Sequence, residues 1–262
     1  MTSSYESILY AEDGKVIRIT LNRPEKRNSL TPGMLEELND AFRRADEAKD
    51  ACVVILRGAG DKAFCAGADL GGMGGGQGFL EIHEARGKFP ELFMRMLRLS
   101  KPVLAAVNGH CVAGGLGLML ACDLAIAKGG AKMGTPEVAR GLFPFMISTL
   151  ITRTVGRRRA SEMMFLGETF STEDAETYGL VNKTVPAESF DEAVEQWATK
   201  LAGLSPAVLR LGKQALFHAE GMSLEGSLAH LQGNITVNSM LEDAAEGIAA
   251  FFEKRAPVFK GK

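Results

Sequence analysis

The stretch KPVLAAVNGHCVAGGLGLMLACD, residues 101–123, decides the fold class. Its residues 103–107 are apolar without alternation, which is typical of a strand buried on both faces of a sheet. Asn108 and Gly109 follow as a turn signal, and residues 113–123 favour a short helix that opens on glycines. A strand, a glycine-rich turn and a helix in succession are typical of α/β architecture.

The same order occurs upstream. Residues 15–21 (KVIRITL) alternate apolar and polar side chains, which predicts a strand with one buried face. Thr31 is a candidate N-cap for an amphipathic helix. Residues 52–56 (CVVIL) predict a second buried strand, which runs into the glycine-rich loop of residues 57–78, and residues 79–100 predict the next helix.

The last third of the chain has a different pattern. Beyond about residue 200 the segments 205–221, 223–244 and 246–259 predict helices with no strand between them. We therefore expect a core of residues 1–200 and a helical region of residues 201–262. Such helices are suited to packing on the core or on a neighbouring subunit.

Composition excludes several function classes. A net charge of −2 lacks the basic excess that nucleic acids or anionic membranes require. The four cysteines stand singly, which favours reduced thiols, and the histidines lack metal spacing. Residues 1–14 show neither the basic start nor the apolar core of a signal peptide, and no segment reaches the ~18 apolar residues of a membrane span. We expect a cytoplasmic protein with no metal.

One glycine-rich motif invites a dinucleotide interpretation. Residues 58–63 (GAGDKA) fit the pattern GxGxxG/A after a predicted strand. However, no helix is predicted at this turn, and no strand ending in Asp or Glu follows about 20 residues later. We therefore do not expect NAD binding.

Two other turns suggest a site for a developing oxyanion. Residues 66–70 (AGADL) follow the first buried strand, and residues 108–115 (NGHCVAGG) follow the second. Small residues leave backbone N–H groups exposed, as oxyanion stabilisation requires. Either turn alone could equally be a tight turn of a compact core, and His110 could either polarise a substrate group or hydrogen-bond the backbone.

Further motifs complete a resemblance that covers the whole chain. In order they are LNRP and NSL (21–24 and 28–30), FCAGADL (64–70), the stretch 101–123, PE (136–137) and YGLV (178–181). The chain resembles the enoyl-CoA hydratase/isomerase (crotonase) family. The resemblance implies a superhelix of ββα turns, a helical C-terminal trimerisation region, assembly into a homotrimer or hexamer, and an acyl-CoA thioester as substrate.

The resemblance also implies roles for individual residues. Two peptide N–H groups of the family bind the thioester carbonyl, and they fall here on Ala68 and Gly114. Candidate CoA contacts fall on Arg23, Lys26, Ala66, Asp69, Leu70, Phe251 and Lys254, the last two from this chain or a neighbouring subunit. Any single Lys or Arg among them could equally be a solvated surface charge. No cofactor is implied, since CoA is part of the substrate.

The acids differ from those of the dual-glutamate hydratases of the family. The later one is present as Glu137, but the position of the first is occupied by Gly117. On a helix that begins near Gly114, a residue three positions later lies on the same face, so position 117 should face the site. A single carboxylate suits moving a proton from one carbon to another, whereas hydration must also activate water.

We therefore expect double-bond isomerisation with Glu137 as the acid and base. The alternatives are a hydratase with a second acid from elsewhere, an acyl-CoA decarboxylase or hydrolase, and a catalytically decayed acyl-CoA binder. Candidates for the wall of an acyl pocket are Met73, Phe79, Phe89 and Phe93, although core packing is the ordinary role of such residues. Residues 71–78 are either a flap over the acyl chain or a surface loop.

Overall fold

A six-stranded sheet forms the centre of the computed structural model, which describes residues 5–69, 71 and 78–262. Its strand order is β1-β2-β3-β5-β7-β10. β1 and β2 pair antiparallel, and the other neighbours pair parallel. The strands are β1 (Ile8–Asp13), β2 (Val16–Leu21), β3 (Val53–Gly58), β5 (Val103–Val107), β7 (Leu124–Lys128) and β10 (Lys183–Val185).

A second sheet has the order β4-β6-β8-β9. Its strands are β4 (Ala63–Cys65), β6 (His110–Val112), β8 (Lys132–Gly134) and β9 (Thr169–Ser171). Their three-residue length is too short for periodicity to be visible, and β4 and β6 lie where the sequence predicted only a loop and a turn. The chain passes from β3 to β4, from β5 to β6 and from β7 to β8, and a helix follows each pair. These ββα units confirm the predicted superhelix.

The helices are α1 (Pro32–Glu47), α2 (Phe79–Arg98), α3 (Gly114–Leu120), α4 (Phe145–Leu166), α5 (Thr172–Thr177), α6 (Phe190–Ala202), α7 (Pro206–Ala219), α8 (Leu224–Ser239) and α9 (Glu242–Glu253), with 3₁₀ turns η1 (Pro24–Lys26), η3 (Pro136–Arg140) and η4 (Ala187–Ser189). The predicted cap of α1 is confirmed, because Oγ1 of Thr31 accepts a hydrogen bond from the Met34 amide at 3.1 Å. No helix opens between β3 and β4, as the sequence predicted for this turn.

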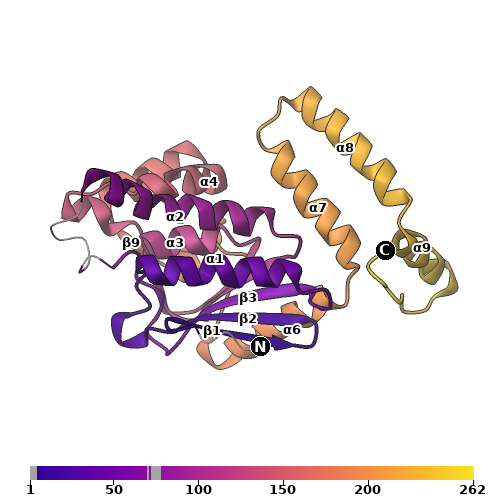
Figure 1. The fold of residues 1–262 in the computed structure, drawn as a ribbon, viewed down its shortest axis with the longest axis horizontal. Helices are drawn as coiled ribbons and strands as arrows, with labels where there is room; N and C mark the ends of the chain where they lie inside the picture. The colour runs from indigo at the N-terminus through magenta and orange to yellow at the C-terminus, as the bar shows by residue number, and fades with distance from the viewer. Residues whose placement is uncertain (1–4, 70, 72–77) are drawn as a thin grey trace.

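The central strand explains why residues 103–107 do not alternate. Val103, Ala105 and Val107 point into the larger apolar cluster, which also receives α1 and α2. Leu104 and Ala106 point into a second cluster beneath α6. Both faces of β5 are therefore covered by helices, which Figure 1 shows on either side of the strands.

Helices α7 to α9 extend from the body of the molecule as an arm (Figure 1). They confirm the prediction of helices without strands beyond about residue 200. Lys213 of α7 fastens the arm, because its Nζ donates to the Met96 carbonyl at 2.9 Å, the Lys101 carbonyl at 3.1 Å and Asp123 Oδ2 at 2.6 Å. In the described part of the chain, no helix is long and apolar enough to cross a membrane.

Candidate active site

The two candidate oxyanion amides meet at one edge of the small sheet. β4 and β6 are parallel neighbours that pair Cys65 with Cys111, so the turns that follow them lie side by side. A Cβ placed on Gly114 would lie 3.5 Å from the Ala68 nitrogen. A Cβ placed on Gly67 would lie 3.0 Å from the Gly114 nitrogen. The structure therefore brings together the two groups that the sequence singled out.

The Ala68 amide is directed by its neighbours in the chain. Leu30 donates its N–H to the Gly67 carbonyl at 2.8 Å and accepts from the Asp69 N–H at 2.9 Å. In such a parallel bridge the intervening residue points its own N–H to the opposite side. Within the described residues the Ala68 N–H donates to no acceptor, so it is available to a ligand.

The Gly114 amide begins α3, where an N–H has no intrahelical acceptor. The preceding residue, Ala113, has φ 53° and ψ −132°, an unusual conformation for a residue with a Cβ. A hydrogen bond from the Ala113 N–H to the Gly134 carbonyl at 2.9 Å holds it there. Backbone strain thus accompanies the abrupt turn from β6 into α3.

An ion pair braces the Ala68 turn from outside. Arg23 Nη1 donates to Asp69 Oδ2 at 3.0 Å and to the Ser29 carbonyl at 2.7 Å. The Arg23 guanidinium, together with the Gly71 amide, holds the pKa of Asp69 below its usual value. Arg23 and Asp69, both predicted as CoA contacts, therefore bind each other in this structure.

Glu137 lies on η3, the 3₁₀ turn that follows β8. Gly141, in the left-handed conformation, ends this turn. The side chain is half-buried, and its Oε2 is buried without a hydrogen-bond partner among the described residues. Burial raises the pKa of Glu137, against smaller opposing effects of a backbone amide and Arg140. A buried carboxylate oxygen without a partner and with a raised pKa makes Glu137 a candidate for proton transfer.

The prediction that a side chain at position 117 would face an open site is wrong. Gly117 lies one turn beyond Gly114 on α3, as predicted, but the space where its side chain would begin is filled. A Cβ there would lie 2.1 Å from Ile147 Cγ2 and 3.1 Å from Phe93 Cζ. A carboxylate at position 117 therefore cannot simply extend into an open site.

The predicted acyl-wall residues separate into two groups. Phe89 Cε1 lies 3.4 Å from the Cβ position of Gly114, and the ring packs edge-on against Phe93 at a centroid distance of 6.0 Å. Phe79 is 85% exposed and stacks on His83. Met73 lies outside the described residues.

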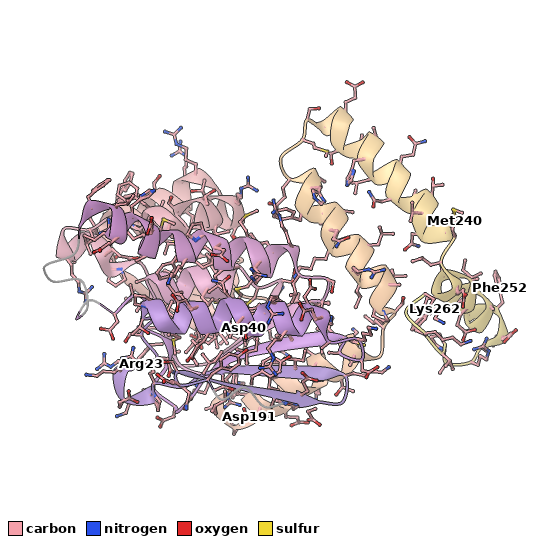
Figure 2. All side chains as sticks on the ribbon, in the orientation of Figure 1. Arg23, Asp40, Asp191, Met240, Phe252 and Lys262 are labelled. Carbon is pink, nitrogen blue, oxygen red and sulfur yellow. The ribbon has the colours of Figure 1, made fainter. Side chains whose placement is uncertain are left out.

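The remaining CoA candidates are spread over the molecule. Lys26 is exposed on η1, and the Ala66 N–H is engaged by the Arg27 carbonyl at 3.0 Å. Leu70 lies outside the described residues. Phe251 and Lys254 lie on or just after α9; Figure 2 shows that neighbouring Phe252 and Arg23 lie at opposite ends of the molecule. Within one chain, Phe251 and Lys254 are not brought to the Ala68 turn.

His110 acts as a turn residue. Its Nδ1 accepts a hydrogen bond from the Lys132 amide at 2.9 Å, and its side chain is exposed at the start of β6. It stands at the end of β6 opposite to Gly114. The interpretation as a backbone-bonded histidine is therefore the one that the structure favours.

The amino-acid sequence is similar to those of known proteins along nearly its whole length. Residues 11–262 match the family described as Enoyl-CoA hydratase/isomerase, and the chain belongs to this family. The 2,3-dehydroadipyl-CoA hydratase of Escherichia coli K12 is 34% identical over 256 residues, covering 97% of this chain and 99% of that protein. The (E)-benzylidenesuccinyl-CoA hydratase of Thauera aromatica is 34% identical, covering 94% of this chain and 96% of that protein.

A solved structure is similar over the same extent. The crystal structure of an enoyl-CoA hydratase from Bacillus anthracis superposes with a TM-score of 0.93 at 34% identity, covering 98% of this chain and all of that one. The predicted family and fold are thereby confirmed.

Proposed function

We propose that this enzyme isomerises the double bond of 3-enoyl-CoA thioesters through an enolate bound by the Ala68 and Gly114 amides. The observation that carries the proposal is the carboxylate oxygen of Glu137, which among the described residues is buried without a hydrogen-bond partner, combined with a glycine at position 117. One carboxylate can serve both proton transfers of an isomerisation.

The proposed reaction conserves every atom. The Glu137 carboxylate removes a proton from C2, and the electron pair of that C–H bond moves toward the thioester oxygen. Two backbone N–H groups then stabilise the negative oxygen of the dienolate, a contribution of typically 10²–10³ in rate for each donor. The Glu137 carboxylic acid returns the proton to C4, so that the C3–C4 double bond becomes a C2–C3 double bond. The CoA of the substrate is the only coenzyme this scheme needs.

Hydration of a 2-enoyl-CoA is the second candidate. It is favoured by the names of the relatives, which are hydratases of dehydroadipyl-CoA and benzylidenesuccinyl-CoA. It requires a second group to hold and activate water, and position 117 offers none. Either reaction would use the same oxyanion amides.

The direct test compares turnover of a 3-enoyl-CoA with turnover of crotonyl-CoA. We expect isomerisation to be the faster reaction by about 10²-fold or more, the scale of a missing acid or base. Calorimetry with acetoacetyl-CoA, an enolate mimic, should show saturable binding. Faster hydration would replace the first proposal by the second, and absence of both turnover and binding would contradict both.

We also propose the assembly and division of the chain that the resemblance implies. Residues 201–262 would form an oligomerisation region, and the chain would act as a trimer or hexamer in the cytoplasm. Support comes from α8, in which no described residue is buried although apolar side chains recur along it. The four free cysteines suit a reducing compartment.

A further inference from the structure

The packing between α3 and α4 makes glycine necessary at position 117. The nearest atom to a Cβ at this position is Ile147 Cγ2 at 2.1 Å, followed by Ile147 Cβ at 3.0 Å. Gly117 lies inside a helix, where glycine costs about 1 kcal/mol relative to alanine and brings no conformational advantage. The glycine is therefore explained by the space that Ile147 occupies.

Ile147 belongs to a series of apolar side-chain contacts that begins beside the oxyanion amides. Phe89 lies beside Gly114, Phe93 packs on Phe89, and both Phe93 and Ile147 abut the position of Gly117. Phe93 and Ile147 are 5% and 2% exposed. Buried hydrocarbon thus fills the space between Gly114 and α4, including the place where a side chain of position 117 would otherwise lie.

A hydrocarbon surface cannot hold the water that hydration needs, because an ordered water requires two to four polar partners. Isomerisation needs no water at all. We propose that Ile147 determines reaction specificity: its side chain fills the place of an acid at position 117, excludes water from that side of the acyl chain and suppresses hydration. This inference rests on the proposed isomerase function.

A first experiment tests the steric relationship without relying on activity. Gly117→Ala should lower the melting temperature by about 4–10 °C in the wild-type background, the scale of overpacking a core in a chain of this size. In an Ile147→Ala background, which removes Cγ2, the same change should cost less than half as much. Additive shifts would show that Ile147 does not restrict position 117 and would overturn the inference.

A second experiment tests water exclusion with a matched pair. Ile147→Thr keeps the Cγ2 methyl against Gly117 and places a hydroxyl where Cγ1 was, whereas Ile147→Val has the same shape without the hydroxyl. We expect the ratio of crotonyl-CoA hydration to 3-enoyl-CoA isomerisation to rise about 10-fold in the threonine variant and to stay at the wild-type ratio in the valine variant. Equal ratios in the two folded variants would overturn the inference.

The double variant Gly117→Glu with Ile147→Ala provides room and an acid together. We expect its hydration-to-isomerisation ratio to exceed that of Ile147→Ala alone by at least about 10-fold. An unchanged ratio in a folded double variant that still binds acetoacetyl-CoA contradicts the role of Ile147 while leaving isomerisation by the wild type intact. If the proposed function itself is wrong, the wild-type enzyme will not isomerise a 3-enoyl-CoA. This result distinguishes that failure from failure of the role of Ile147.

Discussion

The guanidinium of Arg23 and the carboxylate of Asp69 lie 3.0 Å apart, and their side chains are only 20% and 26% exposed. This ion pair connects η1 to the residue that follows the candidate oxyanion amide of Ala68. Asp69 is thereby fixed from two sides, since its N–H also donates to the Leu30 carbonyl. The pair therefore has the geometry of a brace for the Ala68 turn.

Arg23→Ala should release this brace and lower turnover by about 10-fold, because oxyanion stabilisation depends on a preorganised amide. The loss should be equal for an acyl-CoA and for the matching N-acetylcysteamine thioester, which lacks the nucleotide. If Arg23 instead binds a CoA phosphate, only the acyl-CoA reaction should suffer. Lys26→Ala, an exposed residue of the same turn, is the control and should leave the short thioester unaffected.

Ala113 provides a test of backbone strain. Its φ of 53° and ψ of −132° should cost about 1–3 kcal/mol for a residue with a Cβ, and glycine avoids most of this at an entropic cost of about 0.5–1 kcal/mol. We expect Ala113→Gly to stabilise the fold by about 1 kcal/mol in a urea titration and to retain turnover. Ala113 and Ala121 flank the two ends of α3, and Ala121 has an ordinary φ of −80°. Ala121→Gly should therefore destabilise the fold. Destabilisation by both changes would contradict strain at Ala113.

Glu137 should produce a pH-dependent rate. Burial raises its pKa above the ordinary 4.5, and the ionised form is the base. Turnover of a 3-enoyl-CoA should therefore fall as the pH decreases through this raised pKa. Glu137→Gln should reduce turnover by about 10²-fold or more while acetoacetyl-CoA binding survives. Turnover near the wild-type rate in this variant would contradict the mechanism.

The same carboxylate should affect stability with a defined sign. The folded protein holds the Glu137 proton more tightly than the unfolded chain does, so the protonated side chain stabilises the fold. This contribution to the free energy of unfolding is complete below the unfolded pKa and is lost as the pH rises through the folded pKa. Glu137→Gln should therefore melt higher than the wild type at about pH 7, and the difference should shrink at acid pH. Glu188→Gln, at an exposed glutamate of η4, is the control for the effect of the substitution itself.

How far the sequence predicts this site depends on the range of the interactions. The strand at 103–107 and the cap at Thr31 follow from local patterns. The pairing of Ala68 with Gly114 was implied only by the family resemblance, because β4 and β6, which bring the two amides together, are too short to be predicted. Ile147 carried no signal, because it lies 30 residues beyond Gly117 and meets it only through the packing of α4 on α3. A helical wheel gives the direction of position 117 but not what fills the space in front of it.

The oligomer can be tested through the arm. Ile248, Phe251 and Phe252 of α9 are 61%, 77% and 77% exposed in the single chain. Burying such side chains in a trimer would contribute about 1.5–3 kcal/mol each. Light scattering should therefore give three or six times the chain mass of 28.1 kDa, and Ile248→Asp should reduce it. Leu9→Asp, an exposed apolar residue of β1, should leave the mass unchanged, and a wild-type monomer would contradict the assembly.

Lys254 tests whether a neighbouring subunit completes the CoA site. It ends α9 in the left-handed conformation with φ 56°, and α9 lies in the arm that extends from the body of the molecule (Figure 1). If it reaches a CoA phosphate of an adjacent subunit, Lys254→Ala should raise KM for an acyl-CoA by about 10-fold, since a charge-assisted hydrogen bond contributes about 1.5 kcal/mol or more. The N-acetylcysteamine thioester should react unchanged and the oligomer mass should be retained. Ile248→Asp should raise the same KM through loss of the neighbour, so a monomeric Ile248→Asp variant with wild-type KM would show that each chain binds CoA alone.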